Sequence, residues 1–386
     1  ELQTALPGIT FGGSFPKLAQ RADRLCVVRS FTTGNGNHDI KPVVSRHSDG
    51  ASLGAMYSRV AGLNHPHNGL PKHVALFPRA SDPDCQPANV NFGRFDATGT
   101  LGQVYGPFVP GSGGPLQENM TISIPEDRLG DRRRLLTSLD QLKNRIDSTG
   151  AMNGTDRFRS QAWDTILGGA ADAFDLSQEP ESLVRAYDTA PLLPPDRISR
   201  RWNNYNNYVD NAKTLGRLLL LARRLVERGC GFVTVTTNFV WDMHADVNNA
   251  TMDEGMRYMG EPLDHALSAF IDDVEDRGLK DRLMLVCCGE MGRTPRLNAR
   301  GGRDHWGGLA PLMLYGGGVR AGAVIGQSTR DAARPLSEPL GITDLMATVF
   351  HNIMDTGRIR LQSHLPVDLV RTITSGRPIS GVLTET

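Results

Sequence analysis

Short apolar runs alternate along this chain with longer stretches in which apolar residues recur every three or four positions. The apolar runs predict strands at 25–29, 73–77, 232–236, 283–288 and 311–315. The recurring positions predict helices, the clearest of them at 52–60, 215–226, 263–274 and 342–353. Because strands that are apolar throughout alternate with helices, the pattern predicts an α/β fold. We expect a doubly wound, mostly parallel sheet with helices on both faces.

Two regions interrupt this alternation. Residues 80–125 are rich in Gly, Pro, Asn and Asp and predict a long irregular loop region. Residues 131–210 are polar and helical in pattern, which predicts a helical insertion within a single domain spanning residues 1–386. The segment WNNYNNY at 202–208 is typical either of carbohydrate stacking or of a helix with an aromatic core face, and the second interpretation is favoured.

Charge and cysteine content narrow the choice of partners only slightly. The 42 basic and 42 acidic residues balance, so no general attraction to nucleic acid or to an anionic membrane follows. No apolar run approaches the roughly 20 residues that a membrane span needs. The five cysteines lack the spacing of zinc motifs and suit small buried positions, so cysteine usage leaves the compartment open.

Polar side chains follow two of the predicted strands at the point where each strand ends. Asp242 and His244 come shortly after the strand at 232–236, and Glu290 follows the strand at 283–288. Ligands of open α/β sheets bind outside the carboxyl ends of the strands, so we expect these groups to form two walls of one site. Carboxylate and imidazole together suit zinc, manganese or iron. The plainer alternative is a capping aspartate and a surface histidine.

Further candidates lie in loops. Asp304 and His305 close a loop that contains glycines and add a carboxylate and an imidazole as potential metal ligands. His38 lies in a polar loop after the strand at 25–29. Arg293 follows Glu290 on a glycine turn and can offer a fork of donors to a sulfate or phosphate group. A Glu290–Arg293 ion pair is the simpler alternative, but the clusters taken together favour a metal or anion site.

Several segments together resemble one protein family. They are FPKLAQRADRLCVVRS at 15–30, WDMH at 241–244, GEMGRTP at 289–295, GGRDHW at 301–306 and ITDLMATVFH at 342–351. In this order they are similar to the family called domain of unknown function 1501, a sulfatase-like branch of the alkaline-phosphatase superfamily. The resemblance covers most of the chain. It implies a doubly wound α/β sheet with a metal site at the carboxyl ends of its strands.

The resemblance also implies metal ligands. Asp242 and His244 resemble one pair of ligands, and His305 resembles the late histidine ligand. Glu290 stands where relatives in the superfamily place an Asp-His pair, with Met291 in place of the histidine. The cofactor implied is a divalent metal, with zinc, manganese and calcium all open.

Catalytic roles follow from the same resemblance. His38 lies in the loop that carries the nucleophile in the wider superfamily, and Thr33 and Thr32 are the hydroxyl candidates there. Arg293 and the metal would stabilise the charge that grows on the transferred group.

The front of the chain departs from the family pattern. Family members usually open with a strand and a Gly-Gly, His and Asp motif, and this chain starts beyond that point, near LPGI at 6–9. We therefore expect an N-terminally incomplete domain whose sheet shows a gap or an exposed edge near 25–29, filled by another segment or by a partner chain. The loss would cost the site a carboxylate. Family members commonly carry a twin-arginine export signal, which implies a periplasmic or extracellular location.

Two functions follow as expectations. The leading one is an exported metal-dependent hydrolase of sulfate or phosphate esters, acting on a small molecule or a glycan. The alternative is a non-catalytic exported assembly or binding protein that keeps the fold but has an incomplete metal site. Neither nucleic acid nor a membrane span is expected, and a homo-oligomer or a partner chain would complete the sheet.

Overall fold

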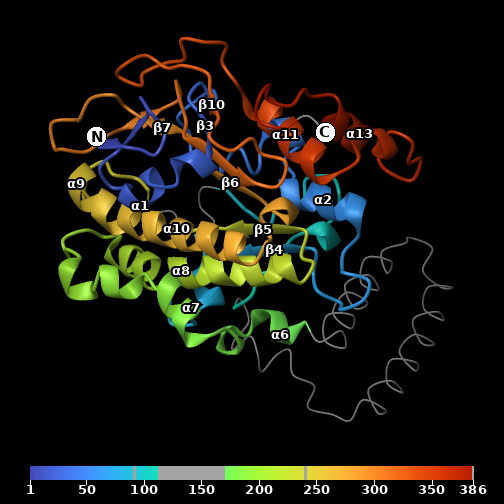
Figure 1. The fold of residues 1–386 in the computed structure, drawn as a ribbon, viewed down its shortest axis with the longest axis horizontal. Helices are drawn as coiled ribbons and strands as arrows, with labels where there is room; N and C mark the ends of the chain where they lie inside the picture. The colour runs from blue at the N-terminus through green and yellow to red at the C-terminus, as the bar shows by residue number, and fades with distance from the viewer. Residues whose placement is uncertain (90–92, 112–169, 239–240, 385–386) are drawn as a thin grey trace.

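Strands and helices form a layered α/β arrangement in a computed structural model that describes residues 1–89, 93–111, 170–238 and 241–384 (Figure 1). A four-stranded sheet has the order β10-β3-β9-β6. Its strands are β3 (Cys26–Val28), β6 (Met284–Cys288), β9 (Leu312–Gly316) and β10 (Val324–Ile325). A parallel pair, β4 (His73–Leu76) and β5 (Phe232–Val235), lies next to β6. The α/β class and the strands predicted from the apolar runs are confirmed.

The direction of one strand corrects the expected sheet. β9 runs antiparallel to both of its neighbours, β3 and β6, whereas β10 runs parallel to β3. The central sheet is therefore mixed: β3, β6 and β10 run in one direction and β9 in the other, and a mostly parallel, doubly wound sheet is not shown by the described strands. An apolar run shows that a strand is covered on both faces but not which way it runs, so β9 has the same pattern as a parallel strand.

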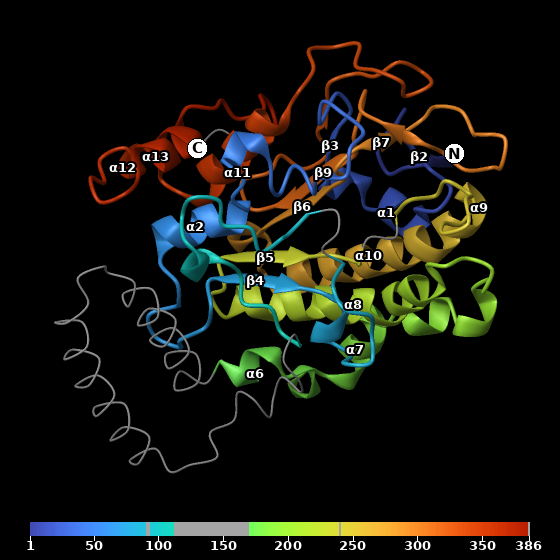
Figure 2. The same cartoon turned by 180° about the vertical axis from the view of Figure 1, so that it is seen from behind.

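Helices cover both faces of the sheet, as the pattern predicted. On one face, Tyr315 of β9 and Leu285 and Cys287 of β6 pack with α8 (Tyr205–Glu227) and α10 (Glu261–Asp276). On the other face, Leu312 and Leu314 of β9 and Cys288 of β6 pack with α11 (Ile342–Ile353). Figures 1 and 2 show α8 and α10 side by side, with α2 (Leu53–Ala61) and α11 beyond the strands.

The remaining elements are short. They are β1 (Leu2–Gln3), β2 (Thr10–Phe11), β7 (Gly292–Arg293), β8 (His305–Trp306), α1 (Pro16–Ala19), α6 (Ala171–Phe174), α7 (Glu181–Tyr187), α9 (Met252–Gly255), α12 (Thr356–Ile359) and α13 (Val367–Thr374). β1 pairs with β2, and β7 pairs with β8.

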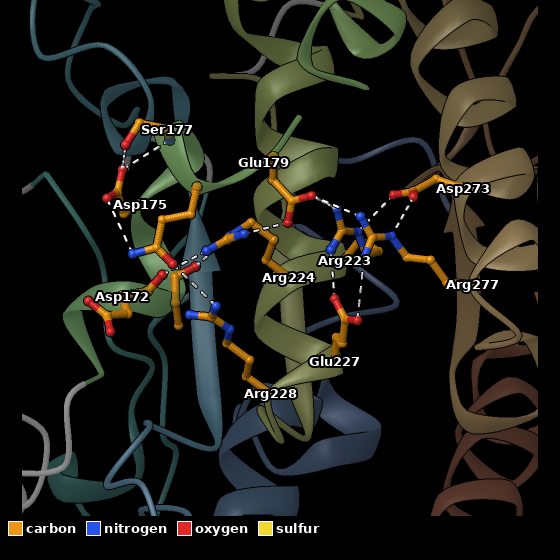
Figure 3. A network of polar contacts seen from close by, with 12 residues as sticks. Asp172, Asp175, Ser177, Glu179, Arg223, Arg224, Glu227, Arg228, Asp273 and Arg277 are labelled. Carbon is orange, nitrogen blue, oxygen red and sulfur yellow. Dashed lines mark hydrogen bonds and ion pairs between the residues drawn. The ribbon is translucent and has the colours of Figure 1, made fainter. Parts of the chain in front are cut away.

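A buried ion network fastens α8 to α10 (Figure 3). The side chain of Arg223 on α8 is fully buried and contacts Glu179 at 2.9 Å and Asp273 of α10 at 2.7 Å. Arg277 binds the same two carboxylates, and Arg224 also pairs with Glu179. Buried charges are stable only when they are paired, so this network fixes the helical layer on which β5 and β6 pack.

The two irregular regions are only partly described. Within 80–125, the described residues include a 3-10 turn at Gln103–Tyr105, and much of the region lies outside the description. Residues 131–169 of the helical insertion expected at 131–210 also lie outside it. The segment WNNYNNY at 202–208 is described throughout and supports the favoured interpretation, because Trp202 and Tyr208 are buried in one cluster with Tyr258. These aromatic residues form a core face.

The expected gap near 25–29 is absent from the described sheet. β3 has β10 on one side and β9 on the other. Among the described strands, β5 pairs with β4 and β6 pairs with β9, so each has a second edge without a ladder. The open edges therefore lie at the outermost described strands, β5 and β6 among them, rather than at β3. No helix in the described ranges is long and apolar enough to cross a membrane.

Candidate metal centre

The predicted site residues reach one place from four separate segments. β6 leads to Glu290, the chain after β5 leads to Asp242 and His244, and the loop after β3 carries His38. His305 begins β8, whose pairing with β7 sets it opposite Arg293. The carboxyl ends of β3, β5 and β6 thus supply most of the site, as the strand-end argument predicted.

Asp242 is the centre of the cluster. Its Oδ2 lies 2.8 Å from Nε2 of His38, and its Oδ1 lies 3.3 Å from Nε2 of His305. Ligand atoms of these three residues all lie within 4.8 Å of one another and could hold a metal ion. His244 adds a fourth donor, because its Nε2 lies 3.0 Å from Nε2 of His305 and 3.7 Å from Oδ1 of Asp242. Three imidazoles and a carboxylate match the ligands that zinc prefers.

Two carboxylates lie behind imidazoles of the cluster. Oε1 of Glu290 lies 2.6 Å from Nδ1 of His38, and Oδ1 of Asp304 lies 3.3 Å from Nδ1 of His244. A carboxylate that accepts from Nδ1 leaves Nε2 free of a proton and fixes the direction of the ring. Sequence reasoning treated Glu290 and Asp304 as ligands, whereas here both contact the far nitrogen of a histidine.

Arg293 shares the carboxylate at the centre. Its Nη2 donates to Oδ1 of Asp242 and, at 2.9 Å, to the carbonyl oxygen of Trp241. Its Nη1 lies 3.5 Å from Nε2 of His244. The ion pair of Arg293 therefore runs to Asp242, in place of the Glu290–Arg293 pair considered from the sequence.

Two threonines that follow β3, Thr32 and Thr33, are held by hydrogen bonds. Thr33 is buried, and its hydroxyl donates to the carbonyl oxygen of Glu290 at 2.6 Å. The backbone N–H of Thr32 donates to the carbonyl oxygen of Leu340. Both contacts fasten the end of β3 to neighbouring segments.

The charges of the cluster shift its ionisation. Burial disfavours a charged His38, but Asp242 and Glu290 outweigh it and raise the pKa of His38 to about 9. Burial also disfavours a charged Asp242, but its imidazole and guanidinium neighbours hold the pKa of this carboxyl well below the usual range. The hydrogen bond with Asp242 raises the pKa of His244, whereas burial lowers the pKa of His305. In the ion-free cluster the Asp242 carboxylate thus favours a proton on His38 and on His244.

Two glycines lie so close to histidines of the site that a side chain would crowd them. A Cβ at Gly302 would lie 2.2 Å from the carbonyl carbon of His244, and one at Gly36 would lie 3.0 Å from Cβ of His305. A side chain at Gly302 would therefore push the His244 segment away from the centre.

Sequence reasoning gave Asn298 no role, although the structure places it at the site. Its Nδ2 donates to the carbonyl oxygen of His244 at 3.0 Å and lies 3.2 Å from Oδ1 of Asp304. Its Oδ1 accepts from the N–H of Gly302 at 3.0 Å. Asn298 ends the segment GEMGRTPRLN at 289–298, and this position next to a family motif was the one feature of the sequence that could have indicated a role at the site.

Comparison with known proteins agrees with the resemblance seen in the motifs. A search of the curated proteins finds no match to this chain. The family model described as "Protein of unknown function (DUF1501)" matches residues 1–363. Because this match covers most of the chain, the protein belongs to the DUF1501 family.

Proposed function

We propose that this protein is a metal-dependent hydrolase of sulfate or phosphate esters, of the alkaline-phosphatase superfamily type. The observation that carries the proposal is the convergence of His38, Asp242 and His305 within 4.8 Å, with Arg293 on the same carboxylate. An ordinary structural ion pair would need only one cationic partner for Asp242, whereas here two imidazoles and a guanidinium contact it. Perturbed carboxylates and imidazoles that gather at strand ends are typical of functional sites.

The donor set fits a divalent ion. His38, Asp242 and His305 would hold it, with His244 as a further donor. A bound zinc or manganese ion supplies Lewis acidity and lowers the pKa of a bound water toward neutrality. Calcium, and to a lesser degree manganese, prefers oxygen ligands, so the three imidazoles favour zinc.

The remaining residues have supporting roles in this proposal. Arg293 presents a planar fork of N–H donors next to the centre, which suits the oxygen atoms of a sulfate or phosphate group. Glu290 and Asp304 orient the imidazoles of His38 and His244. The alcohol part of the ester could belong to a small molecule or to a glycan.

One observation favours the alternative, a non-catalytic exported assembly or binding protein. The hydroxyl of Thr33 already donates to the carbonyl oxygen of Glu290, and this bond competes with a role as nucleophile. A protein of this kind could still bind a metal through His38 and Asp242 without turning over an ester.

Turnover of model esters tests the choice. Purified protein is stripped with a chelator, reloaded with zinc, manganese or calcium, and assayed with 4-nitrophenyl sulfate and 4-nitrophenyl phosphate. The hydrolase predicts metal-dependent turnover that Asp242→Asn abolishes. Asp368→Asn is a matched control, since Asp368 pairs with Arg371 on the exposed face of α13. Tight metal binding without turnover of either ester would favour the binding protein.

We also propose that an extended segment, from a partner chain or a second copy, completes the sheet between β5 and β6. The second edges of both strands lack a ladder among the described strands, and Val235 of β5 packs in one cluster with Leu285 of β6. Buried backbone N–H and C=O groups are almost always paired, so an added strand would satisfy them. Hydrogen exchange tests this proposal. A completed sheet predicts slow exchange at the alternate amides of β6 that face the added strand, and fast exchange at those amides would mean that the edge is open.

Export to the periplasm or the cell exterior is part of the same proposal. Its support is the family resemblance. Fractionation of the native host, followed by immunodetection of the protein, tests it directly.

A further inference from the structure

A buried lysine lies beneath the loop that carries His38. Lys41 is only 4% exposed. Its Nζ donates to Oδ1 of Asn35 at 2.9 Å, to the carbonyl oxygen of Asn37 at 2.8 Å and to Oδ1 of Asp39 at 2.7 Å. An ammonium group has three N–H donors, so each of them has an acceptor. Lysine is rarely buried unless it is paired in this way.

The three acceptors surround His38 in the sequence. Asn35 and Asn37 come before it, and Asp39 comes after it, so the chain on both sides of the histidine is bound to one cation. Asn35 is fastened further, because its Oδ1 also accepts from the N–H of Asn37 at 2.8 Å. The loop is therefore wrapped around the ammonium group of Lys41.

Glu290 of the candidate site binds the backbone of the same loop. The N–H groups of Asp39 and Ile40 donate to Oε2 of Glu290 at 3.2 and 2.9 Å. Ile40 has a φ of 50°, a value that a β-branched residue adopts only when its surroundings impose it. The contacts of Lys41 with residues 35–39 and of Glu290 with the N–H groups of Asp39 and Ile40 supply that constraint.

We propose that Lys41 is a positioning residue for the metal centre. Its ammonium group holds residues 35–39 in the shape that points Nε2 of His38 at Asp242. The loop is rich in Asn and Gly, so without this cation it would sample other conformations and His38 would leave the centre for part of the time. The inference rests on the proposed metal site, because it concerns how one ligand is presented.

Metal affinity measured on folded protein tests the proposal. Lys41→Met keeps the length of the side chain and removes all three donors. We expect its affinity for zinc, measured by competition with a chromophoric chelator, to fall by about 10–100-fold. Lys41→Arg should not restore the affinity, because a planar guanidinium cannot match three acceptors that converge on one nitrogen.

The control and the temperature dependence separate positioning from general stability. Lys213→Met is the matched control, since Lys213 on α8 also pairs with an aspartate, Asp82. Its zinc affinity should equal that of the wild type. A purely structural role of Lys41 would lower zinc affinity only in proportion to the unfolded fraction. A positioning role lowers it at temperatures where circular dichroism shows Lys41→Met fully folded.

The possible outcomes separate failure of the proposed function from failure of the role assigned to Lys41. Wild-type protein that binds neither zinc nor manganese would refute the proposed function and the inference together. Zinc bound equally by wild type and Lys41→Met would overturn only the inference. If Lys41→Met fails to fold, Asn35→Ala removes one acceptor from the same ammonium and should weaken zinc binding in the same direction, and unchanged affinity in that variant also overturns the inference.

Discussion

Replacing Glu290 with glutamine moves the proton on the imidazole of His38, a proposed metal ligand, without changing the shape of the site. Oε2 of Glu290 accepts from two backbone N–H groups, those of Asp39 and Ile40, and Oε1 faces Nδ1 of His38. A glutamine has one oxygen, and the two N–H groups require it. Its NH2 group must then face Nδ1 and donate to it. The proton of His38 moves to Nε2, which is the nitrogen that would bind the metal.

The structure sets the size of the effect. The side chain of Glu290 is 19% exposed and its contact with His38 is short, at 2.6 Å. Loss of a carboxylate that orients a ligand histidine costs about 10–100-fold in metal affinity, which corresponds to about 1.4–2.7 kcal/mol. Asp304 has the same role for His244, but it is 55% exposed and lies at 3.3 Å. Asp304→Asn should therefore cost less than about tenfold.

Calorimetric titration of metal-free protein with zinc is the assay for Glu290→Gln. The two variants are compared with wild type in one buffer, because metal binding releases protons and the apparent affinity depends on pH. The reasoning is refuted if Glu290→Gln binds zinc as tightly as wild type does, or if Asp304→Asn is the more damaging change.

Three further predictions concern stability, pH and the proposed anion contact. Glu179→Gln should lower the free energy of unfolding in urea by about 3–5 kcal/mol near neutral pH, because it removes one partner of a buried ion network. Burial disfavours a charged Glu179, but Arg223 and Arg224 lower its pKa to about 2, so this contribution should persist above the unfolded pKa and fade as the pH falls toward 2. In metal-free protein the pKa of His38 is raised to about 9, so the contribution of its charge to stability should be complete below about pH 6.5 and lost as the pH rises through about 9. The melting temperatures of wild type and His38→Gln should therefore converge as the pH rises through this range. Arg293→Lys should keep zinc affinity within a few-fold but reduce ester turnover by about 100-fold, because the fork of donors is lost while the charge remains.

Much of the fold could be predicted from the spacing of apolar residues. The strands at β4, β5 and β6 and the long helices α8, α10 and α11 follow directly from it. The antiparallel direction of β9 could not be predicted, because coverage by helices on both faces gives the same apolar run in either direction. The partners of β3 also depend on contacts that are distant in the sequence and leave no local pattern.

The site could be predicted as a set of residues but not as a geometry. Asp242 and His244 follow the carboxyl end of a strand, where polar groups tend to converge, and His305 lies in a motif of the family. Whether a carboxylate meets a metal or the far side of an imidazole depends on side-chain directions, so Glu290 was assigned as a ligand although it contacts Nδ1 of His38. Lys41 gave no signal, because a lysine among polar residues is typical of a solvated loop.

Zinc binding by the wild-type protein and by Asp242→Asn tests the central claim most directly. Asp242 is the group that His38, His305 and Arg293 share, so its carboxylate is the one that the centre can least replace. The metal-site account predicts about one equivalent of tightly bound zinc for folded wild type. It predicts a loss of affinity of at least about 100-fold for folded Asp242→Asn. Equal binding by the two proteins, or no binding by the wild type, would contradict the account.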